Sequence, residues 1–262
     1  MNKLTDASSY ALDLIRVISA QIVLIGHAMS FYGVYPNKFP DIQNIGVVIF
    51  FILSGFIISY TISSKIKMKK GAYTFTEYFI ERFSRIYSGY IPAVIFVILI
   101  DSLYILVFPD NYPYKSNFNI ETAIANIFMI QTYPLSHILP LGSNGPVWTL
   151  VIEWWLYMAF GWLVIRIINL KDFSIKSTSV LLVLSIVPIY NIIVGKGNGL
   201  TMMWLMGFVI FTSLFKGSEL NMNKKILNIL FVVFFILALT RVTYTLEEYD
   251  LLFASLLGWS LY

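Results

Sequence analysis

The stretch Val94-Ile95-Phe96-Val97-Ile98-Leu99-Ile100 decides the fold class. Seven apolar residues follow one another without the polar alternation of a membrane β-barrel strand, so the stretch predicts a helix. It lies inside a longer apolar run, Tyr90–Phe108. A run of about 20 apolar residues is long enough for a helix to cross the roughly 30 Å of bilayer hydrocarbon. The stretch therefore predicts a membrane-spanning helix.

The composition of the whole chain agrees with a membrane protein. Of the 262 residues, 58% are hydrophobic and only 12% are charged, and the mean hydropathy is +0.77. Because a soluble domain carries roughly 25% charged residues, these values argue against a soluble enzyme, a disordered chain and a nucleic-acid-binding protein. With no cysteine and only two histidines, the chain has no disulfide or thiolate site, and no metal site is expected.

Further apolar runs of similar length occur along the chain. They are Asp13–Phe31, Gln43–Ser64, Val147–Ile168, Ser179–Val194, Leu200–Phe215 and Ile226–Val242, and another begins near Tyr249 and continues to Tyr262. The predicted fold is all-α: a polytopic bundle of seven to eight transmembrane helices, in a single domain over residues 1–262.

The distribution of positive charge predicts a cytoplasmic N-terminus. With that orientation, 14 of the 18 lysines and arginines lie on or near the cytoplasmic side, as the positive-inside rule requires. Residues 111–145 are then extracytoplasmic. Within them, the moderately apolar piece Ile120–Gln131 is expected to lie on the outer face or to dip into it without crossing.

Residues 65–88 are predicted to form a cytoplasmic connection in two parts. The basic run 65–70 suits an anchor to anionic lipids of the inner leaflet. In Thr74–Ser88 the aromatic residues recur at helical spacing, which predicts an amphipathic helix lying along the membrane.

Three ionisable residues inside predicted spans are candidate functional residues, because such groups are costly in lipid. They are Arg16, His27 and Glu153. Arg16 and His27 are eleven residues apart, so they project from one face of a helix about 16 Å apart along its axis, and Asp13 lies near that face. The alternative is that Arg16 reaches the membrane boundary and pairs with Asp13, while His27 bonds to a neighbouring helix.

Glu153 is predicted at a depth similar to that of His27. Counted from the outer ends of their spans, Glu153 lies roughly 9 Å deep and His27 about 6 Å deep. A carboxylate near an imidazole fixes its tautomer and stabilises the imidazolium formed when it accepts a proton. The two residues would therefore suit deprotonation of a hydroxyl, if their helices are neighbours.

Four segments together resemble the acyltransferase-3 family of integral membrane acyltransferases. In the family's order they are Leu12–Arg16 with His27, Gly46–Phe56, Phe79–Tyr87 with its paired arginines, and Gly145–Glu153 with its tryptophan and glutamate. One departure is Ile86-Tyr87 where the family usually has proline after the arginines. The family also has more spans than this sequence shows, so the chain is expected to be incomplete at its C-terminal side.

The resemblance implies an enzyme that moves an acyl group, often acetyl, from cytoplasmic acyl-coenzyme A to a hydroxyl of a cell-surface glycan or glycolipid. It implies that His27 is the catalytic base and that Arg16 lines the donor channel. We expect Glu153, or electrostatics supported by Asp13, to assist His27. Arg82 and Arg85 would hold the phosphates of the donor. Acyl-coenzyme A is then a substrate, and no permanently bound cofactor is expected. The expected location is the bacterial plasma membrane, and a homo-oligomer is left open.

Each of these residues also has a structural interpretation. Arg82 and Arg85 could be an exposed helical pair with Glu81 bridging to Arg85. Ser54 and Gly55, counted as supporting residues, favour close helix packing, and Trp148 suits an aromatic belt at the interface. For the whole protein, the alternative function is a transporter with a polar pathway along the first span.

Overall fold

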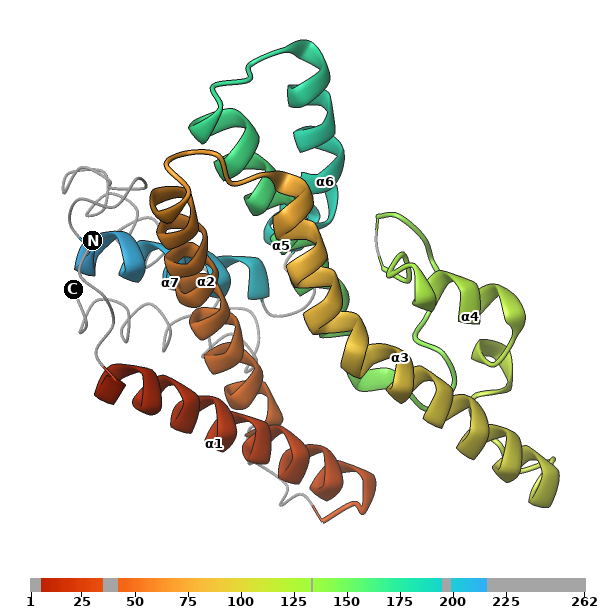
Figure 1. The fold of residues 1–262 in the computed structure, drawn as a ribbon. Coiled ribbons are helices and arrows are strands. Elements are labelled where there is room, and N and C mark those ends of the chain that lie inside the picture. Colours follow the sequence, from red (N-terminus) through yellow and green to blue (C-terminus); the bar gives the residue numbers. More distant parts are fainter. Residues whose placement is uncertain (1–5, 35–41, 133, 195–198, 216–262) are drawn as a thin grey trace. The chain divides into compact units, whose positions relative to one another are not determined.

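The computed structural model describes residues 6–34, 42–132, 134–194 and 199–215. In this part of the chain all regular structure is helical (Figure 1), which confirms the predicted fold class. The α-helices are α1 (Asp6–Phe31), α2 (Ile42–Met68), α3 (Phe75–Val107), α4 (Ile120–Ile127), α5 (Trp148–Trp162), α6 (Ile175–Val194) and α7 (Leu200–Leu214).

Five helical segments among the described residues are long and apolar enough to cross a membrane. They are α1, α2, α3, the continuous stretch Gly145–Asn169 that contains α5, and most of α6. Helix α7 is apolar but shorter, with 15 residues. The predicted spans Ile226–Val242 and beyond Tyr249 lie outside the described residues, so the span count and the side of the N-terminus stay predictions.

The chain forms two compact units. The first comprises Met1–Lys69 and Gly195–Tyr262, and its described part holds α1, α2 and α7; the second, Lys70–Val194, holds α3 to α6. Each unit is described by itself.

In the first unit, α2 crosses α7 with the two backbones in contact. At the crossing, Gly55 faces the Trp204 carbonyl and Gly207 faces the Ile52 carbonyl, and a Cβ on Gly207 would lie 2.7 Å from the backbone nitrogen of Phe56. Small residues allow such an approach between membrane helices. The indole Nε1 of Trp204 donates a hydrogen bond to the Ser54 hydroxyl at 3.1 Å. This arrangement agrees with the close-packing interpretation of Ser54 and Gly55.

In the second unit, α3 differs from its prediction. The expected interfacial helix Thr74–Ser88 and the expected span Tyr90–Phe108 form one helix of 33 residues. A capping box begins it, in which the Thr74 side chain accepts from the Glu77 backbone and the Glu77 carboxylate accepts from the Thr74 backbone. Neither Gly89 nor Pro92 ends the helix, because an interior proline removes only one backbone bond and membrane helices tolerate this.

The basic connection before α3 is also shorter than predicted. Helix α2 continues to Met68, so Lys65 and Lys67 belong to its last turn, where cations stabilise the helix dipole. Lys70 and Gly71, which follow the helix, both have positive φ. The Asn169 side chain donates to the Gly71 carbonyl at 2.9 Å.

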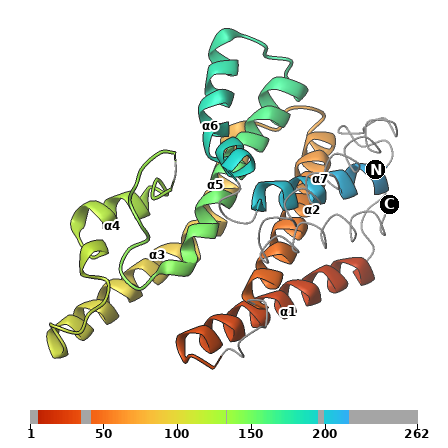
Figure 2. The same ribbon diagram turned by 180° about the vertical axis from the view of Figure 1, so that it is seen from behind.

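Helices α3 and α5 of the second unit run antiparallel (Figure 2). Phe75 meets Trp162 with ring centroids 4.9 Å apart, while further along α3 the ring of Tyr87 meets Trp154 at 5.4 Å. Phe79 and Phe83 contact the same Trp154 ring. The aromatic residues that predicted an amphipathic helix therefore pack in part against α5.

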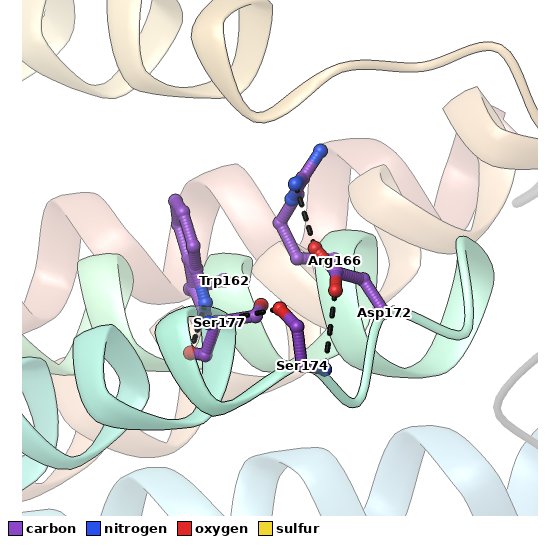
Figure 3. Close-up of polar contacts among 5 residues, drawn as sticks. All are labelled: Trp162, Arg166, Asp172, Ser174 and Ser177. Carbon is purple, nitrogen blue, oxygen red and sulfur yellow. Dashed lines mark hydrogen bonds and ion pairs between the residues drawn. The ribbon is translucent and has the colours of Figure 1, made fainter.

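The turn between α5 and α6 is built from polar contacts (Figure 3). After a π-helical segment, Leu163–Asn169, Arg166 pairs with Asp172 at 2.7 Å. The Ser174 hydroxyl accepts from the Ser177 backbone nitrogen and begins α6, and the Trp162 indole donates to the Ser177 carbonyl. Helix α6 starts at Ile175, earlier than predicted.

Candidate functional site

The candidate residues of α1 lie on the side of the helix that packs against α2. Ser19 and Gly26, the buried residues of α1, mark this side, and Gly26 packs directly against Gln43 of α2. Arg16 and His27 are half-buried at its edge, whereas Leu14 and Leu24 on other faces are exposed. Arg16 and His27 therefore lie beside the contact between α1 and α2, whereas Asp13 is exposed.

Arg16 has a carboxylate partner on its own helix. Its guanidinium forms an ion pair with Asp13 at 3.2 Å, and the Asp13 side chain is 64% exposed. The structural alternative of an Asp13–Arg16 pair is therefore present. An exposed pair of this kind contributes little stability.

The paired arginines of α3 lie in different environments. Arg82 is buried, with 5% of its surface exposed, and its guanidinium lies over the Tyr78 ring, 5.5 Å from the centroid. Its Nε has no hydrogen-bond partner among the described residues. Arg85 is exposed. The two arginines are three residues apart and so lie on neighbouring positions of the helix, but Arg82 is buried and Arg85 is exposed.

A chain of contacts connects Arg82 with Glu153 inside the second unit. The Tyr78 hydroxyl donates to the Tyr157 carbonyl at 3.0 Å, and the Tyr157 hydroxyl donates to the Glu153 carboxylate at 2.5 Å. Glu153 is half-buried on α5. Two tyrosines thus link a candidate donor-binding residue to a candidate catalytic residue, and neither tyrosine was singled out as a site residue from the sequence.

A further tyrosine is hydrogen-bonded to Glu81, the residue before Arg82. Tyr73, just before α3, is fully buried and donates a hydrogen bond to Glu81 at 2.9 Å. Burial raises the pKa of the Tyr73 phenol well above its usual range, and the hydrogen bond to Glu81 raises it further. Glu81, the residue that could bridge to Arg85, therefore serves at least in part as the acceptor of Tyr73.

The remaining residues to place are Trp148, which was predicted, and Asp101, which was not. Trp148 begins that helix and is 37% exposed, as a belt residue would be. Asp101 of α3 is a buried ionisable residue that the sequence reasoning passed over, although the rule that selected Arg16 would also have selected it. Its carboxylate accepts from the Tyr112 hydroxyl and from the backbone and hydroxyl of Ser143.

The comparison with known families decides the identity of the chain. Residues 9–261 match the family described as Acyltransferase domain. The chain belongs to the acyltransferase-3 family. The match confirms the family that the four motifs predict, and it extends over nearly the whole chain.

A curated relative of this acyltransferase-3 chain is the O-acetyl transferase of Shigella phage Sf6. The two are 29% identical over 173 residues, which cover 64% of this chain and 49% of the phage protein. The chain thus spans about half the length of the relative that it matches. No solved structure matches it.

Proposed function

We propose that this acyltransferase-3 chain carries the membrane part of an O-acyltransferase, which moves an acetyl group from acyl-coenzyme A to a hydroxyl of a cell-surface glycan or glycolipid. The observation that supports it most is the family match over residues 9–261, within which Arg16 and His27 lie beside the contact between α1 and α2. The similarity to a phage O-acetyl transferase favours acetyl.

In the proposed reaction, His27 takes the proton of the acceptor hydroxyl as general base. The acceptor oxygen forms a bond to the thioester carbonyl carbon, and the carbon–sulfur bond breaks. The coenzyme A thiolate leaves and receives the proton from the imidazolium. Glu153 is the carboxylate that we propose for stabilising that imidazolium.

The environment of Arg82 supports a role in binding the donor. A buried guanidinium without a carboxylate partner is costly, and among the described residues the Nε of Arg82 has no hydrogen-bond partner while its guanidinium lies over the Tyr78 ring. An anionic group such as a phosphate of coenzyme A would satisfy it, because the planar guanidinium suits phosphate oxygens. Arg16 and Arg85 are the further donor-binding residues that we propose, and Arg85 is exposed.

The test is acyl transfer by the full chain in membranes supplied with acetyl-coenzyme A. Because the chain has no cysteine, a thiol reagent reports released coenzyme A without background from the protein. Ester groups on surface glycans are read by NMR in cells with and without the gene. We expect His27→Ala to abolish thiol release and esterification, while Gln21→Ala, an exposed position on the same helix, retains both.

The same assay separates the alternatives. A transporter would release no thiol and label no acceptor. Full activity of a folded His27→Ala variant would remove His27 from the mechanism, and thiol release without glycan esters would point to a different acceptor.

A further inference from the structure

Tyr157 and Glu153 lie about one helical turn apart on α5, and their side chains are hydrogen-bonded. The Tyr157 hydroxyl donates to Oε1 of the Glu153 carboxylate at 2.5 Å. Residues four apart lie on one face of a helix, and a long side chain leans over the turn that precedes it. The tyrosine therefore reaches back to the carboxylate in the direction that helix geometry favours.

The surroundings of this hydrogen bond exclude most solvent. Tyr157 is 7% exposed, and Glu153 is half-buried. Hydrogen bonds to an ionised group are roughly twice as strong as neutral ones, and the low dielectric of a protein interior strengthens them further. The bond can therefore hold the carboxylate in one orientation.

The Glu153 carboxylate keeps an oxygen for another partner. Oε1 accepts from Tyr157, and among the described residues no second hydrogen bond and no ion pair reaches this carboxylate. A neutral hydroxyl leaves the negative charge in place, whereas a lysine or arginine partner would offset it. A carboxylate held in this way is suited to stabilise an imidazolium.

The turn of α5 that carries Tyr157 is itself fixed by α3. Tyr78 is 0% exposed, and its hydroxyl donates to the Tyr157 carbonyl at 3.0 Å. The Tyr78 ring lies where a Cβ of Gly161 would otherwise be. A catalytic group needs neighbours that hold it in the productive geometry, and these contacts hold the backbone from which Tyr157 extends.

We propose that Tyr157 is a positioning residue, whose hydroxyl orients the Glu153 carboxylate for acyl transfer. This inference rests on the proposed function, in which Glu153 stabilises the imidazolium of His27. In this role Tyr157 touches neither the substrates nor the reacting atoms. It acts only through Glu153, and this distinguishes it from a residue that merely stabilises the fold.

The test is a cycle of two substitutions in the full chain, assayed in membranes by thiol release from acetyl-coenzyme A. Tyr157→Phe removes the hydroxyl and keeps the ring. Glu153→Asp keeps the charge but shortens the side chain by one carbon, which draws the carboxylate away from Tyr157. Tyr90→Phe is the matched control, because it also removes a buried tyrosine hydroxyl, one that donates to the Asn126 carbonyl.

We expect Tyr157→Phe and Glu153→Asp each to lower kcat by about tenfold or more, because each loses a hydrogen bond to a charged group. The donor KM should stay within about twofold of the wild-type value, since the bond serves the reaction and not donor binding. The two losses should not add, so the double variant should have the kcat of the slower single variant. Tyr90→Phe should keep the wild-type kcat.

A wild-type kcat in Tyr157→Phe or in Glu153→Asp would overturn the inference. So would an equal loss caused by Tyr157→Phe in the wild-type and Glu153→Asp chains, since the hydroxyl would then act without Glu153. These results leave acyl transfer itself standing if the wild-type chain releases thiol and His27→Ala does not. A wild-type chain without transfer would contradict the proposed function and the inference together. Thermal unfolding in detergent checks that Tyr157→Phe folds as Tyr90→Phe does.

Discussion

The Tyr78 ring occupies the space that Gly161 leaves open between α3 and α5, and its hydroxyl donates to the Tyr157 carbonyl at 3.0 Å. A Cβ at position 161 would lie 2.8 Å from the Cζ atom of that ring, closer than carbon atoms approach. Since the Arg82 guanidinium lies over the same ring, the glycine indirectly positions a candidate donor-binding residue.

Gly161→Ala is therefore expected to destabilise the chain. The added methyl group overfills a packed contact, which costs about 1–3 kcal/mol. Gly89→Ala is the matched control, because nothing lies within 4 Å of its added Cβ and alanine favours a helix interior by roughly 0.5–1 kcal/mol. Thermal unfolding in detergent should give a lower Tm for the first variant and an equal or higher Tm for the second. Equal Tm values for both variants would show that the ring moves aside freely.

Arg82→Gln and Arg85→Gln should have unequal effects on the use of acetyl-coenzyme A. A buried hydrogen bond to a charged group contributes about 1.5–3 kcal/mol, and 1.4 kcal/mol corresponds to about tenfold in affinity. The donor KM of Arg82→Gln should thus rise at least about tenfold, and that of Arg85→Gln less, because Arg85 is exposed. Ser84→Ala, exposed on the same helix, is the control. An unchanged donor KM in Arg82→Gln would contradict the proposed role.

Asp101→Asn is expected to loosen the connections on both sides of α4, because Tyr112 lies before that helix and Ser143 after it. The aspartate accepts three hydrogen bonds from Tyr112 and Ser143, and an asparagine turns one acceptor oxygen into a donor. Leaving a buried donor unsatisfied costs about 1–3 kcal/mol. Trypsin should cleave faster after Lys115, which is exposed in the connection between Tyr112 and α4. Asp110→Asn, also exposed, should cleave like wild type. Equal cleavage in both variants would mean that the contacts of Asp101 do not hold this region.

Asp172 predicts a pH dependence at the turn between α5 and α6. Hydrogen bonds from Ser174 and the Arg166 guanidinium lower the pKa of its carboxyl below the ordinary 3.8. A lowered pKa in the folded state contributes stability above the ordinary pKa, and this contribution is lost as the pH falls through the folded value. The Tm difference between wild type and Asp172→Asn should therefore be largest at neutral pH and disappear in acid below that value. A difference that stays constant with pH would assign the effect to packing.

The helices and the family could be predicted from the sequence, because apolar runs and four ordered motifs are local signals. The continuity of α3 could not be predicted, because Ser88 and Gly89 look like the boundary between two helices. In the structure the helix continues through them, and Tyr87 and Tyr90 on either side both donate hydrogen bonds to backbone carbonyls. Helix starts at Thr74 and Ser174 depend on caps, which a hydropathy pattern does not weigh.

For the candidate site, the sequence predicts which residues to consider but not how buried each of them is. Arg16, His27 and Glu153 could be selected because an ionisable group in an apolar run is conspicuous. The different burial of Arg82 and Arg85 depends on where the Tyr78 ring lies, and that depends on Gly161, a distant residue without chemistry of its own. Asp101 is conspicuous by the same criterion, because it is an ionisable residue inside the apolar run Tyr90–Phe108.

The contact of α2 with α7 has a consequence for motion. Where Gly55 and Gly207 bring two backbones together, neither helix can slide along the other without a collision of main-chain atoms, so the pair has to move as one rigid body. If the first unit rearranges to admit the proposed coenzyme donor, the movement is therefore expected at α1, whose displacement would carry Arg16 and His27 with it.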